Sequence, residues 1–171
     1  MTLIAPVIVA AELGATDFAW LDRLRRAHFP PDRNQLPAHL MLFHHLPPSL
    51  LAEIDSRLGF ETRGMAPPMA TIGEPMLFDR GVALRVRSDA LEALRERLAD
   101  AFTGLLAPQD AASWRPHVTI QNKVGSREAR LLHAELVQAF RRPRPLAVTG
   151  IATFFYRGGP WEPIRRYGFA R

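Results

Sequence analysis

The chain has 171 residues, a length typical of one domain that can bury a core without added cross-links. Hydrophobic residues make up 47% of it and charged residues 23%, as in an ordinary soluble globular protein. There is no cysteine, which excludes disulfides, thiolate catalysis and cysteine-ligated zinc, and no apolar run of about 20 residues that could span a membrane. The net charge of +5 comes almost wholly from arginine, since Lys123 is the only lysine. This modest excess suits a phosphate-bearing ligand without requiring one.

The predicted elements form two similar rounds, and the first begins with a nearly continuous apolar run at 3–12. Such a run predicts a strand buried on both faces. A signal peptide is the alternative, but no basic residue precedes the run and Glu12 ends it early, so we expect a cytoplasmic protein. The remaining elements of this round are a helix capped by Thr16 that ends before Pro30, a strand at 38–46, a helix opened by residues 47–49, and a strand at 69–78.

A turn at 79–81 leads into the second round, which repeats this order. Its elements are a strand at 82–86, a helix capped by Ser88, a strand at 116–124, a helix capped by Ser126, and a strand at 146–156. A glycine turn and a last strand up to Phe169 complete the chain. The sequence therefore predicts an α+β fold with duplicated strand–helix–strand–helix–strand halves. No linker divides the halves, so residues 1–171 are expected to form one domain.

The middle strand of the second half carries an unusual row of polar residues. Side chains alternate between the two faces of a strand, so Val118 and Ile120 are expected to point into the core. The opposite face is expected to carry His117, Thr119, Gln121 and Lys123. Such a row is either a solvent-exposed face or a site.

The middle strand of the first half repeats this arrangement. Its core face is expected to carry Leu40, Leu42 and Leu46, and its opposite face His39, Met41, Phe43 and His45. His39 and His117 thus occupy equivalent positions. One histidine on a half-exposed strand is usually a surface residue, whereas two at matching places in a duplicated fold would converge where a phosphate could sit between them.

At these residues the sequence resembles the 2H phosphoesterases, a superfamily that includes bacterial 2'-5' RNA ligases and RNA 2',3'-cyclic phosphodiesterases. The run Arg-Pro-His-Val-Thr-Ile at 115–120 is similar to the second histidine motif of that family. The run Ala-His-Leu-Met-Leu at 38–42 is similar to the first, except that Met41 stands where the family has Thr or Ser. The resemblance implies a bilobal fold with a central cleft, and His39 and His117 on either side of a nucleotide-like phosphodiester.

The resemblance also implies a hydrolysis that uses two imidazoles and no metal or other cofactor. One histidine removes a proton and the other donates one, and a histidine pKa near 6.5 allows either role. On this basis His117 would activate water and His39 would protonate the departing ribose oxygen, although the roles could be exchanged. Thr119 would donate a hydrogen bond to a phosphate oxygen. Gln121 and Lys123 extend this face and are candidate substrate-binding residues, with a solvent-exposed strand end as the alternative for Lys123.

Met41 is counted among the candidate substrate-binding residues, but it cannot perform the expected role because a thioether does not donate hydrogen bonds. Another group could replace the hydroxyl, or the protein could bind a phosphate ligand without turning it over.

The expected partner is RNA or a nucleotide with a 2',3'-cyclic phosphate or a 2'-5' linkage. No membrane or protein partner is expected, and a monomer is the default. Trp161 and Tyr156 could stack on a base, with a packing role as the simpler alternative. A plain α+β interaction domain with incidental histidines is the third interpretation.

Overall fold

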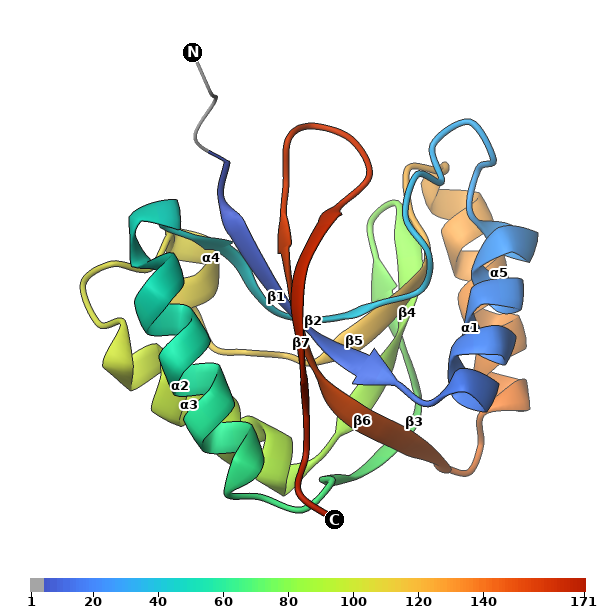
Figure 1. Ribbon diagram of the computed structural model, residues 1–171. Coiled ribbons are helices and arrows are strands. Elements are labelled where there is room, and N and C mark those ends of the chain that lie inside the picture. The colour runs from blue at the N-terminus through green and yellow to red at the C-terminus, as the bar shows by residue number, and fades with distance from the viewer. Residues whose placement is uncertain (1–4) are drawn as a thin grey trace.

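In this computed structural model, which describes residues 5–171, strands and helices alternate in the predicted order (Figure 1). The strands are β1 (Val7–Leu13), β2 (Leu40–Leu46), β3 (Met69–Phe78), β4 (Gly81–Arg87), β5 (His117–Gln121), β6 (Arg144–Phe155) and β7 (Glu162–Gly168). The helices are α1 (Ala15–His28), a 3-10 turn η1 (Pro48–Leu50), α2 (Leu51–Arg63), α3 (Asp89–Ala101), α4 (Pro108–Ala111) and α5 (Ser126–Ala139). The α+β prediction with two equivalent rounds is confirmed, and the short helix α4 is an addition to it.

The sheet consists of two parts that share the long strand β6. Every pairing is antiparallel, and the strand order is β2-β1-β6-β3-β4-β5, with β7 on the other side of β6. Residues 144–147 of β6 pair with β3, whereas residues 148–155 pair with β1. We call β2, β1, β6 and β7 the first lobe, and β3, β4 and β5 the second lobe. β2 and β5, the strands of the two histidine motifs, are therefore edge strands.

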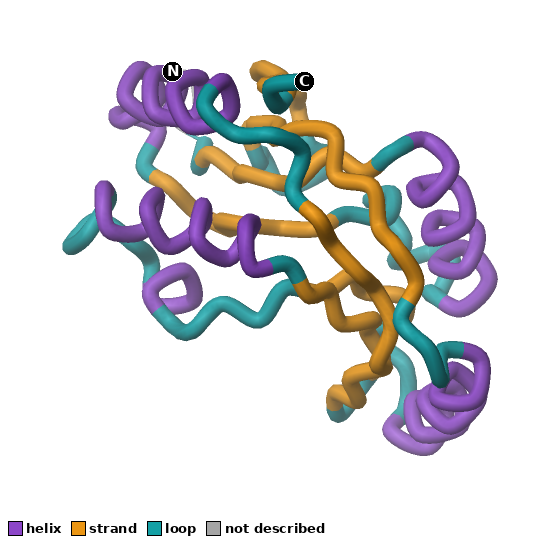
Figure 2. The backbone as a smooth tube through the Cα atoms, turned by 90° about the horizontal axis from the view of Figure 1, so that it is seen from below, coloured by secondary structure: helices purple, strands orange, loops and turns teal. Residues whose placement is uncertain are grey.

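The helices cover the two lobes in a way that mixes the two halves of the chain. α1 comes from the first half but packs on β5 of the second lobe, next to α5. Its Trp20 ring stacks on Phe140 at the end of α5, with 5.9 Å between ring centroids. α3 comes from the second half but lies beside α2, where Arg97 pairs with Glu61. Figure 2 shows the strands between these two groups of helices. The spatial lobes therefore differ from the sequence halves, because the first half contributes α1 and β3 to the second lobe and the second half contributes α3, β6 and β7 to the first.

Two buried arginines fasten these exchanged helices to the histidine strands. Arg25 of α1 donates a hydrogen bond to the carbonyl of Thr119 in β5, with 3.0 Å between the atoms. Arg95 of α3 donates one of 3.0 Å to the carbonyl of Leu42 in β2, and a second to the carbonyl of Asp110. Each guanidinium also lies over an aromatic ring, that of Phe29 or Phe43. Both arginines are almost fully buried, so their N–H groups depend on these protein acceptors.

Several predicted boundaries and caps need correction. β1 is buried on both faces over residues 7–11 as predicted, but it begins at Val7, and residues 3 and 4 lie outside the described part of the chain. Ser88 caps α3 as predicted, since its side chain accepts a hydrogen bond from the Leu91 N–H. The caps predicted at Thr16 and Ser126 are wrong. Gly14 and Gly125 precede those helices in extended conformation, so Thr16 and Ser126 already lie within the first turns.

Replacing Arg95 by methionine tests whether the buried arginine stabilises the fold. The substitution keeps most of the side-chain volume but leaves the carbonyls of Leu42 and Asp110 without this donor, so we expect it to lower the free energy of unfolding by about 2–4 kcal/mol. The matched control is Arg97→Met on the same helix, because its exposed ion pair with Glu61 should contribute less than about 1 kcal/mol. Urea denaturation measures both, and equal losses would contradict a special role for Arg95.

Candidate functional site

The two predicted histidines are held by the same local contact on facing edges of the lobes. His39 lies immediately before β2, and its Nδ1 is 2.8 Å from the carbonyl oxygen of Pro37. His117 begins β5, and its Nδ1 is 2.7 Å from the carbonyl oxygen of Arg115. In both cases the acceptor lies two residues earlier in the chain. The duplicated sequence pattern is therefore matched by duplicated geometry.

This contact decides which ring nitrogen is available for chemistry. A carbonyl oxygen can only accept a hydrogen bond, so Nδ1 must carry the proton when either ring is neutral. Nε2 is then the nitrogen that can take up or give away a proton. Within residues 5–171, Nε2 of His39 and Nε2 of His117 make no hydrogen bond, so both are free to act on a ligand.

His39 lies in surroundings that oppose its protonation. Burial lowers its pKa to about 4, helped by the positive charges of Arg25, His117 and His44 and opposed by the hydrogen bond to Pro37. The effect of His117 on this pKa indicates that the two rings lie within electrostatic range of each other. His39 is therefore unprotonated at neutral pH and can accept a proton there.

A cavity of about 280 Å³ brings residues of both motifs together. His39 and Thr119 both line it, so one residue of each motif borders the same space. The cavity is also lined by Arg25, Arg33 and Lys123, and we call it the cationic cavity. Burial lowers the pKa of Arg25 to about 10, which leaves it charged at neutral pH. The arrangement suits an anionic group beside an imidazole.

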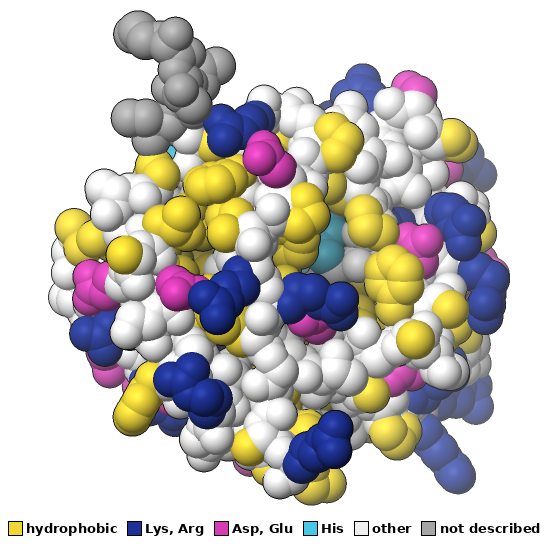
Figure 3. Space-filling model, viewed as in Figure 1, with side chains coloured by type: hydrophobic (Ala, Val, Ile, Leu, Met, Phe, Trp, Pro, Cys, Tyr) yellow, Lys and Arg dark blue, Asp and Glu magenta, His cyan; other side chains and the backbone are white. Residues whose placement is uncertain are grey.

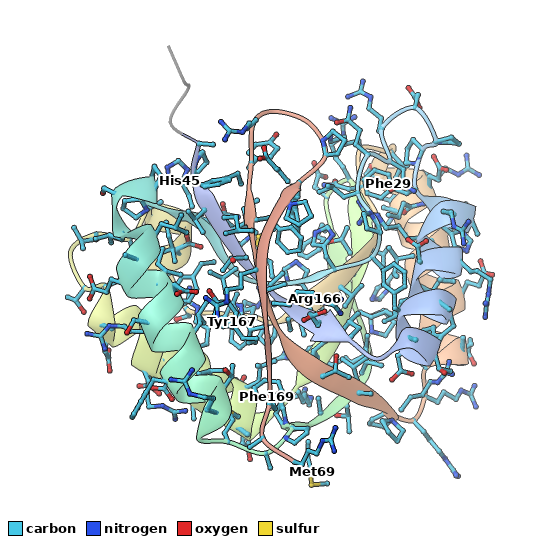
Figure 4. The ribbon with its side chains drawn as sticks, in the orientation of Figure 1. Phe29, His45, Met69, Arg166, Tyr167 and Phe169 are labelled. Carbon is cyan, nitrogen blue, oxygen red and sulfur yellow. The ribbon has the colours of Figure 1, made fainter. Side chains whose placement is uncertain are left out.

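A larger cavity of about 430 Å³ is also lined by His39, and we call it the apolar cavity. Its walls include Trp161, whose ring centroid is 4.8 Å from that of His39, and Phe154, which contacts Trp161 in turn. Figure 3 shows a hollow on this face, with histidine atoms at its floor and apolar side chains around it. Arg166 lies in front of this region in Figure 4. Trp161 comes from the β6–β7 connection, so an element of the first lobe covers one side of His39.

Two other predicted members of the second motif lie differently from the expectation. Val82 pairs with Gln121 but Ala83 pairs with Thr119, so Ile120 is the extra residue of a β-bulge. A bulge interrupts the alternation of faces, and Gln121 is 2% exposed with an unpaired side-chain oxygen rather than lining either cavity. Gln121 is therefore buried next to the bulge rather than exposed, and its part in the site stays a prediction. Lys123 does reach the cationic cavity, but from a turn after β5 with a φ of 63°.

Irregular pairing also changes the first motif. The register between β1 and β2 shifts twice, so Phe43 enters the hydrophobic core instead of joining the face of His39. Met41 is half-buried and lines neither cavity, while its backbone carbonyl accepts a hydrogen bond from the Trp114 indole at 3.0 Å. His45 is exposed and lines neither cavity, and Figure 4 places it at the upper left of the molecule, away from Arg166. Of the four side chains predicted for this face, only His39 reaches the cavities.

Sequence reasoning missed the residues that hold the first motif in place. Asp110 of α4 is buried and accepts hydrogen bonds from the backbone N–H groups of His44 and His45 and lies 3.0 Å from the His44 ring. These contacts hold the pKa of Asp110 below its ordinary value despite burial. No sequence signal marks this carboxylate, because its partners lie more than 60 residues away in the chain.

Neither a metal centre nor a membrane segment is found in the part of the chain that the structure describes. There, no group of three or more His, Asp or Glu side chains could hold a metal ion. No helix within residues 5–171 is long and apolar enough to cross a membrane.

Comparisons with known proteins agree with this fold. A family model described as the 2'-5' RNA ligase superfamily matches residues 14–160. No curated protein matches the chain. Among solved structures, one titled a phosphoesterase is 21% identical, with a TM-score of 0.62 and coverage of 99% of this chain and 100% of that one. LigT of E. coli in apo form is 19% identical with the same TM-score and coverage. TT0787 of Thermus thermophilus is 16% identical, with a TM-score of 0.61 and coverage of 96% and 97%.

The lowered pKa of His39 gives a test that does not depend on any activity. The imidazole should titrate with a midpoint near pH 4, because burial and the nearby cations disfavour its charged form. Nitrogen NMR of the histidine rings between pH 3 and 8 measures this midpoint, and should show Nδ1 as the protonated nitrogen in the neutral ring. A midpoint near the ordinary 6.5 would show that the site is more hydrated than this packing indicates.

Proposed function

The chain belongs to the 2'-5' RNA ligase superfamily of 2H phosphoesterases, and on this premise we propose that it hydrolyses 2',3'-cyclic phosphates on RNA ends or nucleotides, or cleaves 2'-5' linkages. The observation that carries the proposal is the pair of imidazoles, each bound through Nδ1 to a carbonyl and each with a free Nε2. E. coli LigT, which shares the fold, has been crystallised with 3'-AMP and with phosphate, and this supports a nucleotide ligand.

Hydrolysis of a cyclic phosphodiester requires two proton transfers. A base removes a proton from water as its oxygen attacks phosphorus, and an acid protonates the ribose oxygen as its bond to phosphorus breaks. The lowered pKa of His39 favours it as the base, with His117 as the acid. This order is the exchanged form of the one that the family resemblance suggested. The two rings supply both transfers, so this chemistry requires no metal.

The remaining residues of the site would stabilise and position the phosphate. Thr119 lines the cationic cavity with His39, and its hydroxyl can donate to a non-bridging oxygen as negative charge develops there. Arg25, Arg33 and Lys123 surround the same space with positive charge. The apolar cavity, which His39 also lines, can take a nucleobase against Trp161, since bases stack well on aromatic rings.

A second candidate function, supported by Met41, is a nucleotide-binding protein of the same fold with weakened catalysis. Met41 lines neither cavity and cannot donate a hydrogen bond, so the first motif supplies only its histidine. Turnover separates the two candidates.

Hydrolysis of the four nucleoside 2',3'-cyclic monophosphates without added metal tests the proposed reaction. We expect turnover by the wild-type protein, and a loss of about 100- to 10,000-fold in His39→Ala and in His117→Ala, because each removes one proton transfer. His45→Ala is the matched control, since this exposed side chain lies away from the cavities. A folded His39→Ala variant with unchanged rate would disprove the two-histidine mechanism. No turnover with these substrates or with cyclic-phosphate-ended oligonucleotides would favour the binding protein.

Replacing Met41 by threonine tests the cost of the missing hydroxyl. One donor to a developing oxyanion commonly contributes about 100- to 1,000-fold in rate, so Met41→Thr should raise kcat if the side chain can turn toward the phosphate. Met69→Thr is a matched control, because Met69 is 91% exposed at the start of β3. An unchanged or lower rate in a folded Met41→Thr variant would show that a hydroxyl at position 41 contributes nothing to the reaction.

A further inference from the structure

The cationic cavity holds more positive charge than one phosphodiester can balance. Arg25, Arg33 and Lys123 line it, and no acidic residue does. A cyclic phosphodiester or a 2'-5' linkage carries a single negative charge at its phosphorus. A second anionic group would use the cations that the scissile phosphate leaves unpaired.

These three cations also have few close carboxylates among the described residues. The hydrogen bonds of Arg25 go to neutral acceptors, the side-chain oxygen of Asn34 and the carbonyl of Thr119. The charge of Asp22 acts on Arg25 as well, but the ion pair of Asp22 is with Arg26. Arg33 lies 3.9 Å from Asp32, but both side chains are exposed, so this pair contributes little. Lys123 forms no ion pair within residues 5–171.

The arginines of the apolar cavity differ in this respect. Arg165 pairs with Asp55 at 3.0 Å, and Arg166 pairs with Glu12. The excess of positive charge is therefore confined to the cationic side of His39.

The backbone conformation of Lys123 also supports a role for this residue in binding. Lys123 is the only non-glycine residue with a positive φ in the described part of the chain, a conformation that Asn, Asp and Gly adopt more easily. β5 ends at Gln121, one residue after the bulge at Ile120 and just before this turn. Gly81 allows the two segments to approach closely, since a Cβ there would lie 2.0 Å from the Gln121 carbonyl oxygen. A strained residue that lines a functional cavity indicates a role for its side chain.

We infer that Lys123 and Arg33 bind a second phosphate of the substrate, next to the phosphodiester held between the histidines. The favoured substrate class is then a nucleotide with a further phosphate, as at the end of an RNA strand, rather than a nucleoside cyclic monophosphate. This inference rests on the proposed function for the identity of the ligand, but it concerns affinity and does not require turnover.

Calorimetric titration with adenosine 3'-monophosphate and adenosine 3',5'-bisphosphate tests the inference on the intact protein. We expect the bisphosphate to bind about tenfold more tightly or better. Its added phosphate can form charge-assisted hydrogen bonds, which are stronger than those of the uncharged 5'-hydroxyl in the monophosphate. The ratio of the two affinities should fall to about threefold or less in Lys123→Asn and in Arg33→Gln. It should also fall as salt is raised, since the added contacts are between exposed charges.

The controls separate the second phosphate from general electrostatics and from folding. Arg130→Gln on α5 removes the same charge from an exposed position outside both cavities and should leave the ratio unchanged. Asparagine suits the backbone at position 123, and Lys123→Gly provides a second variant with that property. Equal affinities for the two nucleotides, no binding of the bisphosphate, or a preference that survives both substitutions would each overturn the inference. Failure of the proposed function would show instead as absent hydrolysis with the preference intact.

Discussion

Both histidine strands are held by a buried arginine that comes from the other half of the chain. Arg25 of α1 binds the carbonyl of Thr119 in β5, and Arg95 of α3 binds the carbonyl of Leu42 in β2. A guanidinium that has left water requires protein acceptors, so each helix can pack on its strand only while these carbonyls accept its hydrogen bonds. The arrangement of His39 and His117 therefore depends on contacts between the two halves of the chain.

The electrostatics of the site follow from this arrangement. Arg25 holds β5, lines the cationic cavity, and contributes positive charge that lowers the pKa of His39. The surroundings that keep His39 unprotonated thus also attract an anionic ligand. Trp161 contacts the same imidazole and lines the apolar cavity. His39 lines both cavities, so one imidazole borders a cationic space and an apolar space. The phosphate and the base of a nucleotide need two such neighbouring environments.

Strand alternation predicted the site residues only where the pairing is regular. Thr119 follows His117 by two residues with no irregularity between them, and it faces the site as expected. Gln121 follows the bulge at Ile120 and is buried, and Phe43 follows a register shift and joins the core. Alternation assumes one residue per pleat on both strands, and an extra residue on one strand breaks this assumption without changing the sequence pattern.

The sequence by itself determined the order of the elements, the duplicated pattern, and the two matching histidines, because these depend on local periodicity and on short motifs. The Nδ1 contacts are also local in the sequence, since each joins a histidine to a carbonyl only two residues away. Only the tertiary structure decided that α1 and α3 exchange lobes, that Arg25 reaches a carbonyl 94 residues away, and that Trp161 covers His39. Such contacts join distant segments through burial and desolvation, and no local spacing encodes them.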